Sequence, residues 1–501
     1  MRATSARRPP RARRSRSRSF HPARWSRSRR SHSSRHLEEY VRSLDLDAYV
    51  VGGAVRDGLL GSDATDADFL VPGVDIEGLR AALGPHGRTE ELVVAGRPVG
   101  VRFYPRDPSA RKLARAGIEL APPRRELSTG PGRHDFEIVV DPAATVEEDL
   151  GRRDFTVNAM ARRLADGTLV DPYGGRDDLA AGTLRTVSAS SFAEDPLRLV
   201  RGLRFVSQFG LEPDGHTLRQ MREEAASVEL VSGERIGGGL AADGMGELSK
   251  LLLGSQPAKA LRLARDTGVL VHVLPEFEQA IGFEQESRWH ALTVDEHTFE
   301  VVQAAADAGF PLRVRLAALF HDLGKPRVAW RGTDGRLHYY AKHGYSEQSH
   351  EQVGAHLAEG ALDRLRYPTE LRKRVVRLVR SHMLDPGKAD PLRARRLLAR
   401  YGAGLLFDLL NHKEADLRGK GRPADDDLAK LEHFRAVVRA EQGNPHRLAD
   451  LAVGGDDLIA LGYAPGPAIG HALQTLLHEV VDHPDRNTRD VLLERAKELP
   501  K

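Results

Sequence analysis

The sequence predicts an α+β fold, in which an N-terminal domain with a mixed β-sheet is followed by an all-α region. From Leu37 to about Val187, short apolar runs typical of strands alternate with glycine-rich turns and helical stretches. After Phe192 the strand pattern nearly vanishes, and segments such as 196–209 and 256–270 carry apolar residues at helical spacing. A chain of 501 residues is long enough for three or four packed units.

The predicted strands of the N-terminal domain are short and rich in Val, Ile, Leu and Phe. They are expected at residues 49–51, 69–71, 99–101 and 136–140. Beyond them, proline and glycine breaks near Gly282, Pro386 and residues 419–423 indicate joints between helical subdomains.

The composition excludes several classes of protein. Hydrophobic residues make up 40% and charged residues 29% of the chain, as in ordinary globular proteins. No apolar run reaches the roughly 18 residues that a membrane helix needs, and the N-terminus lacks the apolar stretch of a secretory signal. The absence of cysteine excludes disulfides, cysteine zinc sites and thiol catalysis. We therefore expect a cytoplasmic protein, without a membrane partner, whose metals are held by Asp, Glu and His.

The first 36 residues differ in composition from the rest. They contain 13 arginines and no acidic residue, with almost no aliphatic side chain, so we expect them to be disordered. The remaining chain carries 62 Lys and Arg against 71 Asp and Glu, so the formal charge of +4 comes from this segment. Two interpretations stay open: a dispensable extension that includes a mis-assigned start, or a basic arm that adds non-specific RNA affinity.

A glycine pair follows the first predicted strand and opens a helix. Gly52 and Gly53 let backbone N–H groups approach a polyphosphate, and the start of the helix favours negative charge. Arg56, which has Asp57 beside it, can pair with a phosphate. Alone, such a pair is more often a structural turn.

Two aspartates make a phosphate site the better interpretation. Asp66 and Asp68 stand at the start of the next apolar strand, where residues two apart lie on one face. Two carboxylates at one point suit Mg²⁺, which also binds substrate phosphates. A pair of such ions can activate a 3′-hydroxyl and stabilise leaving pyrophosphate. An isolated Asp-x-Asp is usually a solvated strand end, but this one follows a glycine loop.

Further motifs follow in a fixed order. They are RRDFTVNAM at 152–160, DPYGGRDDL at 171–179, EDPLRLVRGLRF at 194–205 and SGERI at 232–236. With the glycine pair and the Asp-x-Asp, they resemble class II tRNA nucleotidyltransferases and bacterial poly(A) polymerases from about residue 49 to the C-terminus. Several ordered motifs are far more specific than any one of them.

The resemblance implies roles for residues of the N-terminal domain. Arg153 would hold the triphosphate, while Asp154 and Asn158 would contact ribose hydroxyls and so distinguish NTP from dNTP. Some relatives add a third carboxylate, for which Glu119 is our candidate. Residues 124–135 resemble the family's flexible loop, which is implicated in switching from C to A addition.

The resemblance also implies a base-reading helix. Glu194, Asp195 and Arg198 would present the base-reading edge, with Arg201 and Arg204 reaching the nucleotide. An Asp acceptor beside an Arg donor can imitate the complementary edge of C or A. Without the resemblance, these charges indicate a salt-bridged helix surface on which Asp195 and Arg198 form an i, i+3 pair.

One segment departs from the family pattern. Gly237, Gly238 and Gly239 follow the SGERI motif, where relatives usually carry helix-forming residues and often an acid. Each glycine costs a helix about 1 kcal/mol relative to alanine. We therefore expect a hinge or a local break at this point.

Histidines and aspartates of the helical region form a second constellation. His297 lies on a predicted helix, His321 and Asp322 end an apolar run, and Asp416 follows far along the chain. This order resembles the HD phosphohydrolase superfamily. Imidazole and carboxylate ligands suit Mg²⁺, Mn²⁺ or Ni²⁺. Further ligands are expected at His350 and His382. In some tRNA nucleotidyltransferases of gamma-proteobacterial type, this domain has phosphatase, 2′-nucleotidase and 2′,3′-cyclic phosphodiesterase activity.

Together the resemblances divide the chain into five parts. They are the basic segment 1–36, a nucleotidyltransferase head (37–187), a helical neck that recognises the nucleotide and binds RNA (188–280), an HD domain (281–420) and a helical tail (421–501).

Residues 361–400 carry 12 Lys and Arg against 4 Asp and Glu, including Arg372, Lys373, Arg374, Arg377 and Arg380. This strip is either a solvated helix face or a contact for tRNA phosphates.

The leading interpretation is template-independent addition of CCA to tRNA from CTP and ATP, with Mg²⁺ at the head. Poly(A) synthesis and CC-only or A-only addition share all these motifs and stay open. An interpretation of a different class is an HD metal phosphohydrolase whose head only binds RNA. The complete set of head motifs argues against it, because a binding module needs no paired carboxylates.

Overall fold

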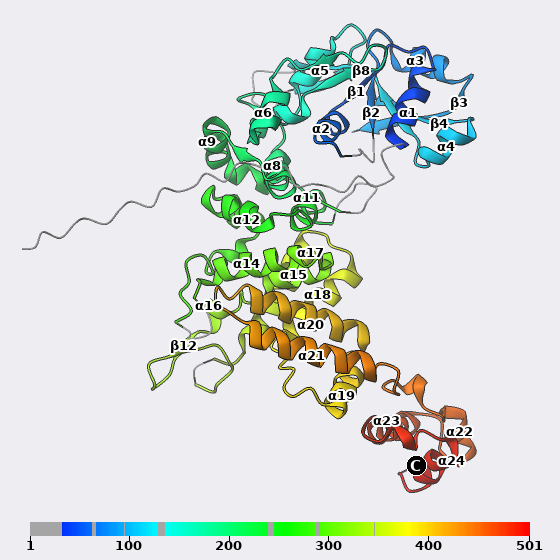
Figure 1. Cartoon of the computed structure of the whole chain (residues 1–501), viewed down its shortest axis with the longest axis vertical. Helices are drawn as coiled ribbons and strands as arrows, with labels where there is room; N and C mark the ends of the chain where they lie inside the picture. The colour runs from blue at the N-terminus through cyan, green and yellow to red at the C-terminus, as the bar shows by residue number, and fades with distance from the viewer. Residues whose placement is uncertain are drawn as a thin grey trace, which may run out of the picture.

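The computed structural model is elongated, with a sheet-containing head at one end and the C-terminus at the other (Figure 1). It describes residues 33–62, 67–94, 96–128, 136–238, 245–286, 291–344 and 346–500. None of the helices in these ranges is long and apolar enough to cross a membrane. Helix α1 (Ser33–Arg42) begins inside the segment that we expected to be disordered, and residues 1–32 lie outside the described part.

A mixed sheet of seven short strands forms the centre of the head. Its order is β3-β4-β5-β2-β1-β8-β9, and β2 pairs with β5 in parallel while the other neighbours are antiparallel. The predicted first strand is confirmed, and the predicted strand 69–71 begins one residue earlier. The strands are β1 (Tyr49–Val51), β2 (Asp68–Leu70), β3 (Gly87–Val94), β4 (Arg97–Pro105), β5 (Ile118–Ala121), β8 (Ala161–Arg163) and β9 (Leu169–Val170).

Helices cover this sheet because their apolar faces meet its buried side chains. Leu79 and Leu83 of α3 share one core with Phe69 of β2 and Phe103 of β4. A separate antiparallel hairpin pairs residues 124–128, the start of the predicted loop, with the predicted strand 136–140, and residues 129–135 of that loop lie outside the described part. These elements are α2 (Gly53–Leu59), α3 (Ile76–Leu83), α4 (Pro108–Leu113), β6 (Arg124–Ser128), β7 (Phe136–Val140), α5 (Val146–Gly151) and α6 (Gly175–Ala181).

One apolar core continues from the end of the head through the neck into the HD domain. Phe155, Phe205, Phe277 and Phe320 all belong to it, although they come from three predicted domains. The head is therefore joined to the helical region by packed side chains as well as by the chain. The neck helices are α7 (Ser191–Glu194), α8 (Leu197–Phe209), α9 (Gly215–Glu223), α10 (Gly233–Ile236), α11 (Glu247–Leu252), α12 (Pro257–Asp266) and α13 (Val269–Val273).

The rest of the chain is helical, as predicted, and its last part has a small core of its own that includes Leu458, Tyr463, Leu476 and Val480. The helices are α14 (Val294–Asp307), α15 (Leu312–Phe320), α16 (Lys325–Val328), α17 (His350–Arg364), α18 (Thr369–Ser381), α19 (Pro391–Tyr401), α20 (Ala403–Arg418), α21 (Asp425–Glu441), α22 (Gly455–Ala460), α23 (Pro467–Asp482) and α24 (Arg489–Lys497).

The prediction of an all-α region missed two pairs of very short strands. One pair joins β10 (Thr183–Leu184) to β11 (Glu212–Pro213), and the other joins β12 (Trp330–Arg331) to β13 (Leu337–His338). Two residues cannot show the alternation that identifies a strand in sequence.

The glycine run of the neck ends a helix and permits close packing. Helix α10 stops at Ile236 with Gly237 as its C-cap. A side chain at Gly238 would collide with the backbone carbonyl of Arg366, and one at Gly237 would come within 2.6 Å of the Tyr367 ring. The N–H of Gly238 donates to the Leu365 carbonyl at 3.0 Å. The local break is therefore confirmed, and its glycines bring the neck against the α17–α18 connection.

We predict that Gly238→Ala lowers the free energy of unfolding by about 1–3 kcal/mol, because the added methyl forces apart two backbones in contact. Urea denaturation at pH 7 measures this change. Gly360→Ala is the matched control, since Gly360 lies within α17 and a Cβ there meets nothing within 4 Å. That variant should be more stable by up to about 1 kcal/mol, because alanine is the better helix former. Equal effects of the two substitutions would contradict the packing role.

Candidate functional site

The glycine turn after β1 lies at the centre of the head site. Gly52 has a φ of 68°, in the left-handed region that favours glycine. A side chain at this position would also collide with the guanidinium of Arg153. The turn therefore needs glycine for its conformation and for the room it leaves to an arginine of the RRDFTVNAM motif.

Arg56 is held in a fixed orientation beneath this turn. Its Nη1 donates to Asn158 Oδ1 at 2.5 Å, and its Nε and Nη2 donate to Asp57 Oδ1 at 2.9 and 2.7 Å. The guanidinium also lies 4.4 Å from the ring centroid of Phe209 on α8. Asp57 therefore orients Arg56, and its carboxylate does not line the hollows described below.

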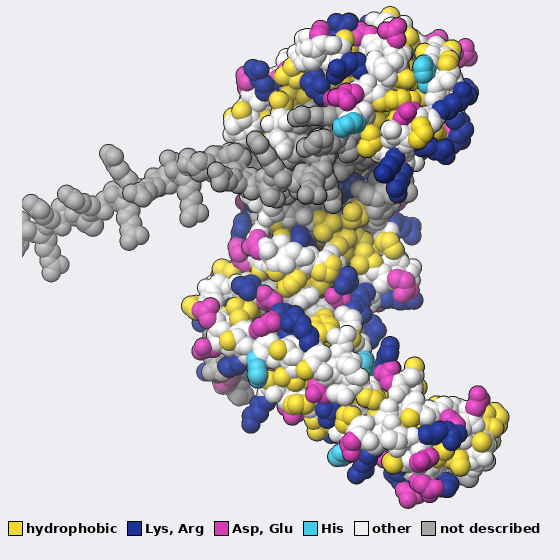
Figure 2. Space-filling view, turned by 45° about the vertical axis from the view of Figure 1, so that its right-hand side comes forward, with side chains coloured by type: hydrophobic (Ala, Val, Ile, Leu, Met, Phe, Trp, Pro, Cys, Tyr) yellow, Lys and Arg dark blue, Asp and Glu magenta, His cyan; other side chains and the backbone are white. Residues whose placement is uncertain are grey.

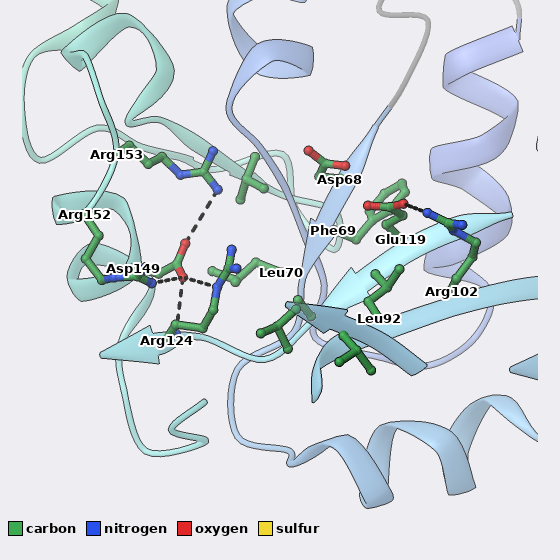
Figure 3. A pocket seen from close by; sticks show the side chains of 14 residues that line it. Asp68, Phe69, Leu70, Leu92, Arg102, Glu119, Arg124, Asp149, Arg152 and Arg153 are labelled. Atoms are coloured by element: carbon green, nitrogen blue, oxygen red, sulfur yellow. Dashed lines mark hydrogen bonds and ion pairs between the residues drawn. The ribbon is translucent and has the colours of Figure 1, made fainter. Parts of the chain in front are cut away.

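Two carboxylates stand side by side on neighbouring strands. Asp68 of β2 is the direct register partner of Glu119 of β5, so their side chains share one face of the sheet. Both line a hollow of about 470 Å³, and Figure 3 shows their carboxylates close to each other at its edge. Glu119 Oε1 accepts a hydrogen bond from Arg102 at 2.6 Å. Asp66 lies outside the described residues.

Asp149 organises the opposite wall of this hollow, and the sequence analysis missed it. Its buried carboxylate lies 3.5–3.8 Å from the guanidinium groups of Arg124, Arg152 and Arg153 (Figure 3). Asp149 is the third of three consecutive acids in the first turn of α5, a pattern typical of a helix start, so the sequence gave no sign of this role. Three arginines around one carboxylate leave this wall of the hollow with net positive charge.

A second hollow of about 400 Å³ adjoins the first. Asp68, Arg152 and Arg153 line both hollows, so the two meet beside the β2 carboxylate. The second hollow gathers most of the residues predicted to bind the nucleotide: Gly53, Arg56, Arg153, Asp154, Asn158, Asp195, Arg198, Arg201 and Arg204. Gly52, Asp57 and Glu194 do not line it.

Asp154 is buried and fully engaged at the base of the second hollow. Arg201 lies 2.8 Å away, and Asn158 Nδ2 and the Phe155 N–H each donate to Oδ1 at 2.9 Å. Burial alone would raise the pKa of Asp154, but the Arg201 charge and these hydrogen bonds lower it to about 2. The carboxylate therefore stays ionised and fixes both Asn158 and Arg201.

Glu247 of α11 holds the two inner arginines of α8 from the other side. Its carboxylate lies 3.3 Å from Arg201 and 3.2 Å from Arg204. Burial lowers the pKa of Arg204 to about 10, and the Glu247 charge partly offsets that effect. In the sequence, Glu247 is the one acid of a leucine-rich segment and belongs to no motif, so the sequence analysis missed it.

The predicted Asp195–Arg198 pair is wrong. Arg198 instead pairs with Glu194 at 2.8 Å and donates to the Arg152 carbonyl at 2.7 Å. Asp195 pairs with Arg235 of the SGERI motif at 2.9 Å. The reason is that Asp195 has extended backbone between α7 and α8, so helical spacing does not apply to it.

A second candidate site lies inside the HD domain, where α14, α15, α17, α18 and α20 converge. Two buried groups of three residues each bring their ligand atoms within 4.8 Å of one another. They are His297, His321 and Asp416, and Asp322, His350 and His382. All six residues predicted for this site are therefore brought together.

Asp322 lies between the two groups. Its Oδ2 is 3.4 Å from His297 Nε2 and 3.2 Å from His321 Nε2. Its Oδ1 is 3.7 Å from His350 Nε2 and 3.8 Å from His382 Nε2. One carboxylate oxygen thus faces each histidine pair.

Backbone carbonyls fix which nitrogen of each histidine faces inward. The Nδ1 atoms of His297, His321, His350 and His382 lie 2.7–3.2 Å from carbonyl oxygens. A carbonyl only accepts hydrogen bonds, so in the neutral ring Nδ1 carries the proton and Nε2 offers a lone pair to the centre. Burial and the neighbouring histidines hold the pKa of His382 well below its ordinary value, which keeps it neutral.

His412 belongs to the same centre, although the sequence analysis missed it. Its ring lies 5.1 Å from that of His321 and 5.7 Å from that of His382, measured between centroids. It is fully buried, and neither ring nitrogen has a hydrogen-bond partner among the described residues. Its position one helical turn before Asp416 could have indicated it. A buried unpaired imidazole facing histidines and carboxylates fits a metal centre.

The geometry defines a nucleotide-binding head with paired carboxylates, joined to a helical domain with a His/Asp metal centre. Family models match in the same order. They are the Poly A polymerase head domain at residues 48–185, the probable RNA- and SrmB-binding site of polymerase A at 210–281, the HD domain at 294–416 and tRNA nucleotidyltransferase domain 2 at 358–496.

Curated relatives cover most of the chain. The multifunctional CCA protein of Nitrosococcus oceani is 33% identical over 86% of this chain and 96% of its own length. That of Alkalilimnicola ehrlichii is 37% identical over 79% and 89%. The chain belongs to the family of multifunctional CCA proteins, nucleotidyltransferases that carry an HD domain.

Solved structures show the same fold. The CCA-adding enzyme of Bacillus stearothermophilus in complex with CTP aligns with 93% of this chain and 96% of its own, with a TM-score of 0.63 at 22% identity. The Thermotoga maritima CCA-adding enzyme complexed with tRNA aligns over 92% and 93%, with a TM-score of 0.52 at 20% identity.

We predict that Asp154→Asn destabilises the protein by about 2 kcal/mol at pH 7, because the ionised form is the one that the fold stabilises. The folded-state pKa is about 2, below the ordinary 3.8. The ionised Asp154 carboxylate therefore makes its full contribution to the free energy of unfolding above about pH 4. This contribution is lost as the pH falls from about 4 to 2. Urea denaturation of both proteins between pH 7 and 2 measures it. Asp177→Asn, at an exposed position of α6, should change the free energy of unfolding by less than about 0.5 kcal/mol.

Proposed function

We propose that the head adds CCA to the 3′ end of tRNA from CTP and ATP, in the order C, C, A. One observation carries this proposal: Asp68, the register partner of Glu119, lines both of two adjoining hollows. The second hollow has the arginines and buried polar groups that a nucleoside triphosphate needs. The first offers the neighbouring space that an RNA 3′ end must occupy to reach the same point.

The head residues supply binding, orientation and metal ligands. Asp66, Asp68 and Glu119 would hold Mg²⁺, because three carboxylates are the hard oxygen donors that this ion prefers. When bound, Mg²⁺ favours ionisation of the 3′-hydroxyl and stabilises the pyrophosphate that leaves. Arg56 and Arg153 neutralise the triphosphate, so the α-phosphate is presented to the hydroxyl at a fixed position.

Base selection rests on the neck helix. Asp195 and Arg198 line the second hollow, each held by a partner on another segment, so they offer a rigid acceptor and donor. Asp154 orients Arg201 and Asn158 toward the nucleotide, with Asn158 also fixed by Arg56. We place the whole reaction in the cytoplasm, where its tRNA substrate is found.

The deciding experiment supplies tRNA that lacks its 3′ terminus with each NTP separately and then with CTP and ATP together. We expect two C residues from CTP alone, none from UTP or GTP, and a complete CCA end from the pair. Sequencing of the product ends measures this. Long A tracts, or labelling by ATP alone, would replace the proposal by poly(A) or A-only synthesis.

Asp68→Ala should lower the rate at least about 1,000-fold, whereas Asp177→Asn should leave it unchanged.

For the HD domain we propose a metal-dependent phosphohydrolase with two divalent ions, Mg²⁺, Mn²⁺ or Ni²⁺. One ion would lie with His297, His321 and Asp416, the other with His350 and His382. Asp322 would be shared, since one of its oxygens faces each group. When bound, such ions polarise a phosphate ester and activate water. Lys325 pairs with Asp322, and Lys413 and Lys420 with Asp416, so metal ions bound to these carboxylates would release the three lysines to contact a phosphate.

Metal content tests the two-ion centre independently of activity. Protein loaded with Mn²⁺ or Ni²⁺ and desalted should hold two ions per chain by mass spectrometry of the metals. His297→Ala and His382→Ala should each lose one ion, because each removes a ligand from one group only. His471→Gln, at an exposed position of the tail, should keep both. One ion in the parent, lost in His297→Ala but kept in His382→Ala, would show that the second group holds none.

A further inference from the structure

A buried tyrosine joins the HD domain to the neck, beneath a surface on which basic and acidic side chains are interspersed (Figure 2). Tyr367 lies in the α17–α18 connection and is 5% exposed. It belongs to the apolar core that the neck shares with the HD domain. Burial raises the pKa of its hydroxyl above the ordinary value, so this hydroxyl keeps its proton. A buried hydroxyl of this kind needs a hydrogen-bond partner.

The backbone of the α17–α18 connection holds Tyr367 in a fixed position. The N–H of Tyr367 donates to the Leu362 carbonyl at 2.9 Å, and the N–H of Arg366 donates to the Asp363 carbonyl at 3.0 Å. Arg366 has a φ of 56°, in the left-handed region. Together these features form the Schellman turn that commonly ends a helix. The connection is therefore a rigid support for the tyrosine side chain.

The ring of Tyr367 packs against the end of α10. A side chain at Gly237 would come within 2.6 Å of this ring, and one at Gly233 would collide with the last carbonyl of α17. Helix α10 also carries Arg235, which pairs with Asp195 at 2.9 Å. Asp195 lines the second hollow, where we propose that it reads the base. The tyrosine ring thus supports the helix whose arginine holds this aspartate.

The hydroxyl of Tyr367 is bonded to α11. It lies 2.9 Å from Oγ of Ser249, a side chain that is 1% exposed. Ser249 Oγ also donates to the Gly237 carbonyl at 3.2 Å. The same carbonyl accepts from the N–H of Gly246, the N-cap of α11, at 2.9 Å. The Gly237 carbonyl therefore joins α10 to α11, and Tyr367 lies against this junction.

Helix α11 leads from this junction to the nucleotide site. Glu247 stands two residues before Ser249 and pairs with Arg201 and Arg204. Both arginines line the second hollow. Because Glu247 and Ser249 belong to one short helix, a displacement of Ser249 also moves the carboxylate that holds the two arginines. The hydroxyl of Tyr367 thus restrains a second group of residues in the same hollow.

We propose that Tyr367 is a positioning residue for nucleotide selection, which acts through α10 on Asp195 and through α11 on Arg201 and Arg204. This inference rests on the nucleotidyl transfer proposed for the head, and it requires no metal in the HD domain. A site that reads a base by hydrogen bonds must hold its donors and acceptors to within about 0.5 Å. Removing the Tyr367 hydroxyl therefore weakens selection while every group that contacts the nucleotide stays in the protein.

The variant Tyr367→Phe tests this role, because it keeps the ring against Gly237 and removes only the hydroxyl. On tRNA that lacks its 3′ terminus, we expect the KM for CTP to rise about fivefold, the effect of one lost hydrogen bond. The preference for CTP over UTP should fall by a similar factor. The kcat and the KM for tRNA should change less than about twofold, since Asp68 and Glu119 are untouched.

Ser249→Ala removes the same bond from the other side. It should change the KM for CTP at least as much, because it also loses the bond to the Gly237 carbonyl. The double variant with Tyr367→Phe should then match Ser249→Ala alone, since the two residues share one interaction. Additive effects of the two substitutions would show that Tyr367 does not act through Ser249.

Tyr463→Phe is the matched control. Tyr463 is 2% exposed in the tail, and its hydroxyl donates to the Ala496 carbonyl at 2.7 Å. Urea denaturation should show a loss of stability like that of Tyr367→Phe, but the KM for CTP and the preference over UTP should stay within about twofold of the parent. Equal KM changes in the two variants, or none in Tyr367→Phe, would overturn the inference.

A parent protein that adds no C to this tRNA would contradict the function proposed for the head. Equilibrium binding then decides the role of Tyr367 separately. For the NTP that the parent binds most tightly, the affinity should be about fivefold weaker in Tyr367→Phe than in Tyr463→Phe. The same affinity in both variants would refute the positioning role.

Discussion

A buried chain of charges joins the head to the neck, and the nucleotide site depends on it. Arg56 binds Asn158, Asn158 binds Asp154, Asp154 binds Arg201, and Arg201 binds Glu247. Burying any of these charges alone would cost several kcal/mol. Because each has its partner, the glycine turn of the head and the base-reading helix of the neck are held in one relative position. The second hollow exists only while that position is kept.

In the metal centre of the HD domain, polar side chains converge on one point instead of pairing along a chain. The Nδ1 atoms of four histidines lie within hydrogen-bond distance of backbone carbonyls, so their Nε2 atoms face one another across Asp322. His412 adds two more nitrogens, which have no hydrogen-bond partner among the residues that the structure describes. In the head, each member of this chain has a protein partner, whereas in the HD domain the lone pairs of the histidines converge on one centre, as the ligands of a metal ion do.

The ordered motifs predicted much of this. They predicted the head fold and the six HD residues that the structure brings together, because each belongs to a local pattern with its own chemistry. Glu119 was a candidate from the resemblance alone, and it lies beside Asp68 in the sheet. Asp149 and Glu247 could not be found in this way, since neither belongs to a motif and each becomes important through arginines that the fold brings to it. The pairing expected between Asp195 and Arg198 was wrong because it assumed an unbroken helix.

By itself, the sequence determined which chemical groups the protein has and the order in which they occur along the chain. The tertiary structure decided which of those groups remain available. Arg374 and Arg380 are six residues apart on α18, but Asp408 of α20 pairs with Arg374, while Arg380 is left to line a groove. The physical reason is that an ion pair depends on distance in space, and residues distant in sequence settle it only when the helices pack.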